Sequence, residues 1–488
     1  MRKIVIVGGG IAGLAAAYTI CQNSELPLEI TLLEQAGYWG GKIITERVEG
    51  LAPTGAFVIE GGPDTFVVTK PWAVRLCQQL GIDGRLKGTN PQVRATYILK
   101  NNRLHELPGG LTMMIPTEFA PMLRTGLLSW PAKARMGLDF ILPPAHGKED
   151  ESLGAFVTRR LGRAAYENLI EPLMSGIYAG DGDRLSLRST FPFLHDLERQ
   201  HGGLVRGALA LRRERQSKAH ENGKGQSRGI FLTPQDGLGE MVGALVEHLE
   251  MAGLKLRLNT AVREVKPTRE GYSIKLSTGE LLEADGLILA TPSFASAQLV
   301  AGFAPALAEE LRPIEYVSTA TVTLAYREAD LPRPLDGYGY VIPRREGRKA
   351  LACTWTSTKF PHRAPDGFAL LRVFIGRAGQ EDEISWDVAS LLETARQELR
   401  MSLGITTEPL LERVYRWEKA MPQYALGHPQ RLERIQSCLS AYPGLALAGN
   451  AYQGIGIPDC IHSGELAAMA VLAALDTVKA EERESVGS

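Results

Sequence analysis

The chain opens with the feature that most limits its possible folds, a strand-like apolar run that leads directly into three closely spaced glycines. Residues 4–7 read Ile-Val-Ile-Val, and Gly8, Gly10 and Gly13 follow before a helix-forming alanine run. In a strand–turn–helix unit of this kind, the first glycine allows the tight turn and the second lets the backbone approach a pyrophosphate. The third lets helix and strand pack closely, and the helix N-terminus faces the phosphate charge. The pattern predicts an α/β dinucleotide-binding unit.

An acidic residue stands where this unit places its ribose contact. Glu34 ends the next apolar run, 21 residues after Gly13, and an acid at that position accepts the ribose hydroxyls of a dinucleotide. Because the glycine pattern follows a strand, opens a helix and has its acid, a chance match is a poor explanation. We predict that the chain binds a dinucleotide.

Two further glycine-rich segments decide between nicotinamide and flavin. Gly40 and Gly41 precede Lys42, and residues 60–64 read Glu-Gly-Gly-Pro-Asp. Taken alone, the first pair could equally be an ordinary loop. A nicotinamide cofactor must come and go, whereas a flavin that stays bound gains from backbone contacts around its second phosphate and ribityl chain. The combination favours FAD.

Bulk properties fit a multidomain enzyme. At 488 residues the chain exceeds what one hydrophobic core usually supports, and a net charge of −1 argues against a nucleic-acid partner. Five scattered cysteines without a C-x-x-C pair favour a reducing compartment over disulfides or a zinc site. We therefore expect no metal site. We also expect a cytoplasmic protein, since the chain begins on a strand and has no apolar run of the ~20 residues that a membrane span needs.

The order of predicted elements divides the chain into interleaved regions. Residues 1–65, 229–295 and 416–480 are expected to form a discontinuous FAD-binding domain. Residues 66–109 and 296–415 are expected to form a substrate-binding domain. The predicted fold class is α/β, with a Rossmann-like FAD-binding domain, a mixed α+β substrate domain and a mainly helical domain between them.

The helical domain is expected over residues 110–228. Its last part, from Arg206 to Arg228, is rich in charge and interrupted by glycine and serine, which predicts a solvated loop rather than a patch for a polyanion.

A C-terminal segment is expected to return to the cofactor. Residues 445–450 read as a strand, residues 454–459 as a loop and residues 461–475 as an apolar helix. The N-terminus of that helix, aimed at the flavin ring, would stabilise the negative charge that develops near N1 on reduction. Because its composition also fits a core helix, we expect the body to pack and the first turn to meet the flavin.

Longer motifs give the sequence a more specific likeness. Residues 171–181 read EPLMSGIYAGD, residues 421–428 read MPQYALGH and residues 454–464 read GIGIPDCIHSG. In order and spacing over essentially the whole chain, they resemble the protoporphyrinogen/coproporphyrinogen III oxidase family, and the soluble Gram-positive type in particular. That type is also similar in Glu60–Asp64 and Lys70. The glycine motifs alone resemble the wider superfamily of flavin amine oxidases and phytoene desaturases.

The resemblance implies a haem-pathway oxidase. Such an enzyme removes six electrons from a porphyrinogen in three two-electron steps, and dioxygen reoxidises the flavin to give hydrogen peroxide. Hydride loss from a meso carbon to flavin N5 leaves a cation delocalised over electron-rich pyrroles, so the step needs placement more than acid–base chemistry. No catalytic side chain is therefore predicted. The Gram-positive likeness favours coproporphyrinogen III, with protoporphyrinogen IX as the alternative substrate.

The resemblance also assigns contacts position by position. Gly176 would lie beside the macrocycle, where a side chain would leave no room, or it is a plain turn glycine. Lys70 would pair with a propionate, or it is a solvated lysine. Asn450 departs from the acid that many relatives carry there, which weakens any ribityl contact at this position. The residues expected at FAD are Gly8, Gly10, Ile11, Ala12, Gly13, Glu34, Gln35, Lys42, Gly61, Gly62, Pro63, Asp64, Val262, Trp417, Ile455, Gly456 and Ile457.

Other functions stay open. An amine oxidase or carotenoid desaturase would share FAD but not the motifs at 171–181 and 421–428. A non-catalytic binder on the same fold, as in the Rab-GDP dissociation inhibitors, would not need the full glycine set and Glu34. Residues 123–143 correspond to a region that membrane-attached relatives use for docking, although a lid or domain core is favoured. The implied partners are a porphyrinogen, dioxygen and the next haem-pathway enzyme.

Overall fold

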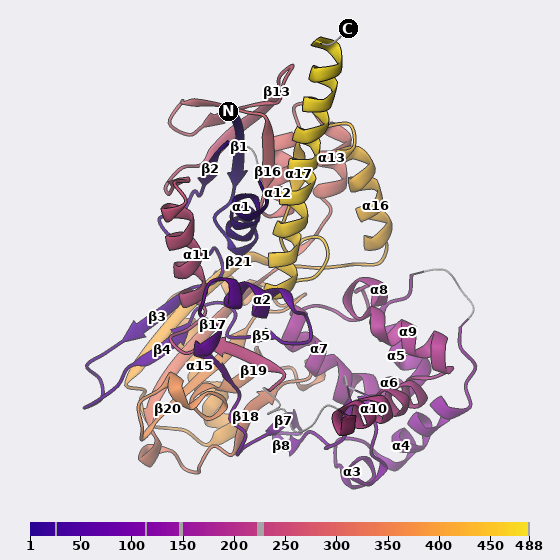
Figure 1. Ribbon diagram of the computed structural model, residues 1–488. Helices are drawn as coiled ribbons and strands as arrows, with labels where there is room; N and C mark the ends of the chain where they lie inside the picture. Colours follow the sequence, from indigo (N-terminus) through magenta and orange to yellow (C-terminus); the bar gives the residue numbers. More distant parts are fainter. Residues whose placement is uncertain (25–26, 113–114, 146–149, 222–228, 487–488) are drawn as a thin grey trace.

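A parallel five-stranded sheet forms the centre of the part that contains the N-terminus (Figure 1). The computed structural model describes residues 1–24, 27–112, 115–145, 150–221 and 229–486. In the order in which they lie in the sheet, the strands are β12 (Lys255–Arg257), β2 (Leu28–Leu33), β1 (Arg2–Val7), β16 (Gly286–Leu289) and β22 (Leu445–Leu447). Segments far apart in the sequence therefore build one sheet, and the structure confirms the predicted α/β dinucleotide-binding fold.

The apolar residues of β1 alternate between two cores because both faces of the sheet are covered. Ile4 and Ile6 pack with one set of helices, whereas Val5 and Val7 pack with a second set and with the small sheet β13-β14-β15. The helices on the first face are α1 (Ile11–Asn23), α2 (Trp72–Gln79), α11 (Gly239–Met251) and α17 (Ile457–Val486). Those on the second face are α12 (Ser293–Val300), α13 (Pro305–Leu311) and α16 (His428–Leu439). The small sheet consists of β13 (Val262–Pro267), β14 (Tyr272–Leu276) and β15 (Leu281–Ala284).

A seven-stranded mixed sheet forms the second part, below the first in Figure 1. Its outer face is covered by α15 (Val388–Leu403). Its inner face packs against the hairpin of β3 (Thr45–Val48) and β4 (Phe57–Glu60), which continues from the dinucleotide-binding unit. The strands, in sheet order, are β21 (Leu411–Pro422), β17 (Tyr316–Arg327), β20 (Phe368–Ile375), β19 (Ala350–Trp355), β18 (Gly337–Val341), β7 (Ala95–Lys100) and β8 (Arg103–Glu106).

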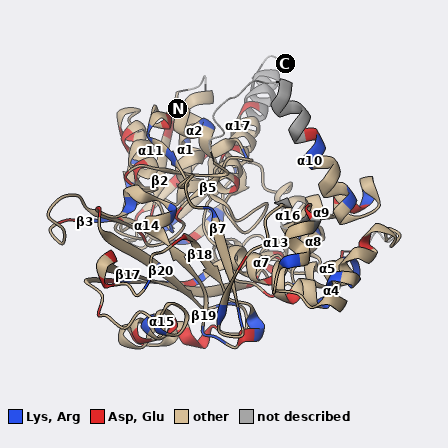
Figure 2. Cartoon of the chain, turned by 90° about the horizontal axis from the view of Figure 1, so that it is seen from below, with Lys and Arg blue, Asp and Glu red and all other residues tan. Residues whose placement is uncertain are grey.

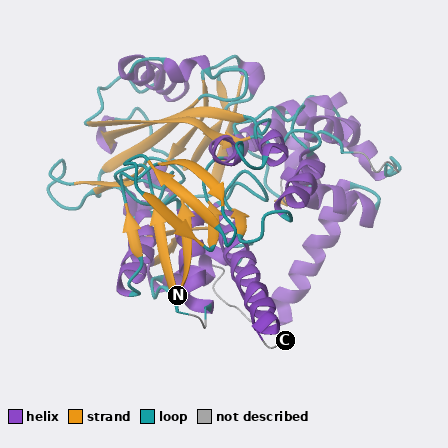
Figure 3. Cartoon of the chain, turned by 90° about the horizontal axis from the view of Figure 1, so that it is seen from above, coloured by secondary structure: helices purple, strands orange, loops and turns teal. Residues whose placement is uncertain are grey.

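Helices form the third part and lie to one side of both sheets, as the view in Figure 3 shows. They share one apolar core that includes Phe156, Leu169 and Met174. The helices are α3 (Phe119–Arg124), α4 (Trp130–Gly137), α5 (Leu153–Leu161), α6 (Arg163–Ala165), α7 (Glu171–Tyr178), α8 (Leu187–Thr190), α9 (Pro192–His201) and α10 (Leu204–Glu221).

The predicted loop from Arg206 to Arg228 is wrong over most of its length, because helix α10 extends to Glu221. Leu204, Val205 and Ala208 are buried at helical spacing and belong to the helical core, and this packing outweighs the local preference of glycine and charge for a loop. Residues 222–228 lie outside the described residues.

The boundaries of the three sequence-based regions stay a prediction. Helix α2 packs with α1 and α17, and strand β21 belongs to the seven-stranded sheet. None of the helices in the described ranges combines the length and apolar character that crossing a membrane requires. In Figure 2, basic and acidic residues are interspersed rather than separated into two faces.

Candidate functional site

The first glycine turn joins β1 to α1 and leaves open space at one position only. Gly8 has φ +110°, and a Cβ on Gly13 would lie 1.9 Å from the Gly8 carbonyl oxygen. A Cβ on Gly10, the N-cap residue of α1, would meet no atom of the described residues within 4 Å. Gly8 and Gly13 are therefore needed for the turn and its packing, whereas Gly10 borders free space at a helix N-terminus. Ile11 and Ala12 begin the helix and are buried.

The predicted ribose acid lies against this turn. One carboxylate oxygen of Glu34 accepts a hydrogen bond from the Gly9 N–H at 2.7 Å, and the other accepts one from the Ala36 N–H at 2.8 Å. Gln35, between them, is exposed. The Thr260 N–H donates a hydrogen bond to the Glu34 carbonyl. Val262, two residues after Thr260, begins strand β13.

The second glycine pair packs on the first turn. The Gly40 N–H donates to the Gly9 carbonyl at 2.8 Å, and a Cβ on Gly41 would lie 3.1 Å from the Gly10 Cα. This approach directs the chain so that Lys42 enters the same region. Sequence reasoning gave the pair even odds of being an ordinary loop, and the structure instead joins it to the dinucleotide turn.

Lys42 places a poorly solvated cation in this region. Its Nζ donates to the Ala420 carbonyl at 2.6 Å, which is its only hydrogen-bond partner among the described residues. Burial lowers the pKa of Lys42 to about 8. An ammonium group has three donors, so Lys42 retains capacity for an anionic or carbonyl group.

The third glycine turn follows β4 and is held by side chains of the seven-stranded sheet. The Gly61 carbonyl accepts hydrogen bonds from Trp417 Nε1 at 2.8 Å and from Thr321 Oγ1 at 2.9 Å. A Cβ on Gly62 would lie 1.8 Å from the Lys42 carbonyl, which places this turn against the second one. Asp64, after the half-buried Pro63, accepts a hydrogen bond from Lys359 Nζ at 3.2 Å.

The C-terminal loop closes the region from another side. Helix α17 begins at Ile457, one turn before the predicted residue 461, and its Gly464 would carry a Cβ only 2.2 Å from the Ala12 carbonyl. Ile455 packs against the helical core, and the Gly456 N–H donates to Asp459. The start of α17 thus lies beside α1 and the helical part.

The motifs that carried the resemblance meet at one tyrosine. Tyr424 donates to the Asn450 carbonyl at 2.6 Å and accepts from the Gly454 N–H at 2.8 Å. Its ring contacts Tyr178 in a T-shaped arrangement, and Gln423 Nε2 donates to the Tyr178 carbonyl at 3.0 Å. Residues that are distant in the sequence are therefore neighbours in the site.

The two predicted substrate residues lie on different elements. Gly176 is exposed on α7, and in the described part of the chain a Cβ there would meet only Val341 Cγ1, at 3.8 Å. Lys70 Nζ forms an ion pair with the buried carboxylate of Asp459, 2.6 and 2.7 Å from its oxygens. The sequence-based alternatives for Lys70, a propionate partner or a solvated lysine, did not include Asp459. Burial, and after it the Asp459 charge, raises the pKa of Tyr178 at the end of α7.

Sequence reasoning missed residues of the seven-stranded sheet that contact the third turn. Arg372 donates to the Gly61 and Gly62 carbonyls, and Arg363 pairs with Glu60 at 3.0 Å. The sequence did contain a sign of these contacts, because Arg372 is a charged residue within the otherwise apolar strand β20. A buried charge in such a strand is costly unless it has partners.

The residues present fit a bound flavin dinucleotide. Open space at Gly10, the acid Glu34, the underused cation Lys42 and the start of α17 surround one region, as the phosphates, ribose and ring of FAD require. Within the described ranges, no three His, Cys, Asp or Glu side chains are grouped so that they could hold a metal ion.

Comparison with known proteins agrees with this geometry. The family model for flavin-containing amine oxidoreductases matches residues 11–472. A coproporphyrinogen III oxidase of Bacillus subtilis (strain 168) is 38% identical over 470 residues, which cover 96% of this chain and 97% of the relative. The protoporphyrinogen oxidase of Homo sapiens is 31% identical over 490 residues, which cover 96% of this chain and 98% of the relative.

A solved structure shows the same fold over the full length. It comes from Exiguobacterium sp. 255-15, carries a provisional assignment as a protoporphyrinogen oxidase, and is 33% identical with a TM-score of 0.83, covering 97% of this chain and 99% of that one. The chain therefore belongs to the flavin-containing amine oxidoreductases, whose cofactor here is FAD, and within them to the group that includes coproporphyrinogen III and protoporphyrinogen oxidases.

Proposed function

We propose that the protein oxidises coproporphyrinogen III to coproporphyrin III, with FAD as the electron acceptor and dioxygen as the final oxidant. The observation that carries this proposal is the near full-length identity of 38% to a coproporphyrinogen III oxidase. The exposed Gly176 offers an open position on α7, and the buried rings of Tyr178 and Tyr424 pack beneath the end of that helix. When bound, the flavin would take up two electrons in each of three steps and pass them to dioxygen.

The chain's own residues would bind and orient. We propose FAD contacts at the glycine turns, at Glu34 and Lys42, and at the start of α17, together with the remaining assigned residues Gln35, Val262 and Trp417. Asp459 would hold Lys70 in a fixed position at the edge of the substrate region. No side chain is proposed as an acid or base, since a delocalised cation needs little proton transfer at the reacting carbon.

The test is aerobic turnover by the FAD-loaded protein with coproporphyrinogen III and protoporphyrinogen IX offered separately. Porphyrin fluorescence and hydrogen peroxide would be recorded together. We expect rapid product from the four-propionate substrate, with three peroxides per porphyrin. Preference for protoporphyrinogen IX would favour the second candidate, which the 31% identity to the human enzyme supports. Absence of product from both, with flavin bound, would exclude either oxidation.

A side chain at Gly176 should impair turnover and spare the fold. Among the described residues, an added Cβ would contact only Val341, at an ordinary 3.8 Å. We expect Gly176→Val to lower kcat/KM for coproporphyrinogen III by about tenfold or more, which corresponds to about 1.4 kcal/mol of lost transition-state stabilisation. Gly176→Ala should show a smaller loss. FAD content and Tm should stay at the wild-type value, and an unchanged kcat/KM in the valine variant would remove Gly176 from the substrate region.

Lys42 should make FAD binding depend on pH. Burial holds its pKa at about 8 without cofactor, and a bound anion would raise it. Above pH 8 the complex therefore keeps a proton that the cofactor-free protein releases, so the affinity for FAD falls by up to about tenfold per pH unit. Below pH 8 the side chain is charged in both states and contributes no slope. Fluorescence titrations of the cofactor-free protein between pH 7 and 9 measure this change.

Two variants at this position serve as controls. Lys42→Met should bind FAD more weakly at pH 7 and lose the decline above pH 8, whereas Lys42→Arg, which stays charged, should keep affinity and lose the decline. A methionine variant with the wild-type profile would show that another group titrates.

We further propose that the protein passes its product to the next haem-pathway enzyme. We also propose that it contacts a membrane surface through α3, α4 and the turn that follows. Support for the membrane contact comes from exposed apolar side chains in residues 123–143. Trp130 is 68% and Ile141 75% exposed, with Lys133 Nζ 4.7 Å from the centre of the Trp130 ring. Exposed apolar side chains beside basic ones are typical of helices that lie on a membrane surface. The alternative role of this segment is a lid or part of the domain core.

A further inference from the structure

The turn of residues 61–64 is fixed by side chains from three strands of the other sheet. Trp417 (β21) and Thr321 (β17) donate to the Gly61 carbonyl at 2.8 and 2.9 Å. Arg372 (β20) donates to the same carbonyl at 3.3 Å and also to the Gly62 carbonyl. Three donors on one carbonyl exceed what a turn needs for hydrogen bonding, since a carbonyl oxygen has two lone pairs.

Arg372 is a costly residue at this place. It is 3% exposed in a strand that is otherwise apolar, and its Nε has no hydrogen-bond partner in the described part of the chain. Two ion pairs lie close to it, Lys359 with Asp64 and Arg363 with Glu60. With Arg372, three cations face two carboxylates, so the cluster has an excess of positive charge. Buried charged groups of this kind cluster at functional sites.

The hydrogen bonds that the Gly61 carbonyl accepts also affect the N–H of Gly62. The Gly61 carbonyl and the Gly62 N–H belong to one peptide group, and a hydrogen bond to the carbonyl makes the N–H a stronger donor. Within the described residues, this N–H has no partner, although Gly62 is half-buried. The peptide is therefore held in one orientation and polarised, with its donor unused.

We propose that Arg372, Thr321 and Trp417 form a donor cluster that positions the 61–64 turn for the flavin. Arg372 is its central positioning residue. The cluster strengthens FAD binding, and the excess charge of Arg372 favours the reduced flavin and so raises its midpoint potential. This inference rests on the proposed contact between that turn and FAD.

Thr321 and Thr323 provide a matched pair for the test. Both lie on β17 and are buried, 4% and 2% exposed, and Thr323 pairs with Arg372 across the strands. Thr321 Oγ1 donates to the turn, whereas Thr323 Oγ1 has no hydrogen-bond partner among the described residues. We expect Thr321→Val to weaken FAD binding roughly three- to tenfold, the effect of one hydrogen bond. Thr323→Val should stay within about twofold of wild type.

Two substitutions at Arg372 distinguish the effect of its hydrogen bonds to the turn from the effect of its positive charge. Arg372→Met should weaken FAD binding about 10- to 100-fold, because the lost hydrogen bonds involve a charged group, and should lower the midpoint potential. Arg372→Lys keeps the charge, so it should retain the wild-type potential and lose less affinity. Dissociation constants from flavin fluorescence and potentials from dye-coupled reduction measure both effects in the full chain.

The outcomes are decisive even where one variant fails to fold. If Arg372→Met is insoluble, the difference between Thr321→Val and Thr323→Val decides the proposal. Equal FAD affinity in these two variants would overturn it. Failure of the proposed function looks different, since the wild type would then bind FAD normally and oxidise no porphyrinogen while these differences in affinity persist.

Discussion

Gly10→Ala is expected to give a folded protein that no longer retains FAD. The added methyl meets nothing within 4 Å, and Gly10 has φ −71° and ψ 174°, which alanine adopts without strain. Alanine is a poorer N-cap than glycine, so the free energy of unfolding should fall by at most about 1 kcal/mol. The methyl would occupy the space in which the backbone approaches the pyrophosphate, and we expect the dissociation constant to rise on the order of 100-fold or more.

Gly13→Ala should behave differently although the substitution is the same. Its Cβ would lie 1.9 Å from the Gly8 carbonyl oxygen, which is backbone and cannot move aside without opening the β1–α1 packing. Overpacking of this kind costs roughly 1–3 kcal/mol or more, so both FAD and stability should be lost. Gly243→Ala, on the exposed side of α11 with nothing within 4 Å, is the control and should stabilise slightly.

Absorbance of the purified proteins and urea unfolding of their cofactor-free forms separate these cases. A Gly10→Ala protein with wild-type affinity for FAD would show that the phosphates bind elsewhere. A Gly13→Ala protein of normal stability would show that the turn adapts. Only the combination of a stable Gly10 variant and an unstable Gly13 variant agrees with the geometry of the turn.

The sequence predicted the α/β fold because its signals are local or strongly periodic. The run from Ile4 to Gly13 specifies a strand, a turn and a helix without help from the remaining chain. Strands β16 and β22 were also recognisable from their apolar runs. Helix α10 was not, because its charged and glycine-containing sequence favours a loop and only its packing against the helical core makes it a helix.

Prediction of the site was limited in the same way. The glycine turns and Lys42 could be proposed from motifs, since each lies in a short recognisable segment. The ion pair of Lys70 with Asp459 joins residues 389 positions apart, and the contacts of Arg372 join β20 to a turn 310 positions earlier. Nothing in local spacing relates such residues. A charged residue inside an apolar strand was the one available sign, and it indicates a partner without identifying it.

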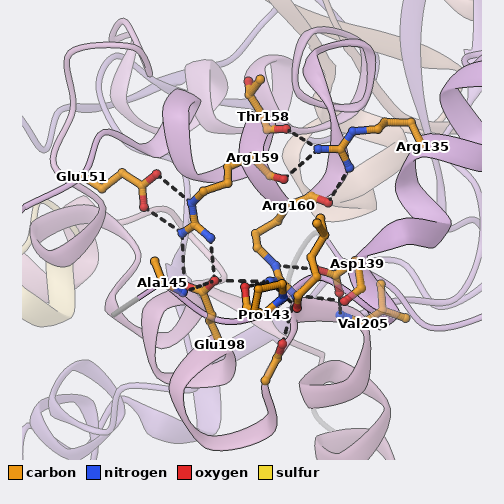
Figure 4. A network of polar contacts seen from close by, with 12 residues as sticks. Arg135, Asp139, Pro143, Ala145, Glu151, Thr158, Arg159, Arg160, Glu198 and Val205 are labelled. Atoms are coloured by element: carbon orange, nitrogen blue, oxygen red, sulfur yellow. Dashed lines mark hydrogen bonds and ion pairs between the residues drawn. The ribbon is translucent and has the colours of Figure 1, made fainter. Parts of the chain in front are cut away.

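A buried charge network in the helical part carries the largest expected effect on stability. Arg160 and Asp139 are both 0% exposed, and Arg160 Nε donates to Asp139 Oδ1 at 2.6 Å (Figure 4). The other guanidinium nitrogens donate to the carbonyls of Asp139, Leu142, Pro143 and Gly202. The second oxygen of Asp139 accepts the Val205 N–H at 2.8 Å. The pair thus joins the turn after α4 to α5 and to the start of α10.

Asp139→Ala should lower the free energy of unfolding by about 3–5 kcal/mol, because it leaves a buried guanidinium without its main counter-charge. That is a large share of the roughly 5–15 kcal/mol that stabilises a typical domain, so the helical part should unfold first in a urea series followed by hydrogen exchange. Replacing both partners, as in Asp139→Leu with Arg160→Met, should recover much of the loss, because the unpaired guanidinium is then removed and the buried Glu198 keeps its ion pair with Arg159. Arg163→Gln is the control, since Arg163 is 52% exposed in its ion pairs and should change stability by about 0–1 kcal/mol. If the double variant is no more stable than Asp139→Ala, removing the unpaired charge gains no more than the lost backbone hydrogen bonds of Arg160 cost.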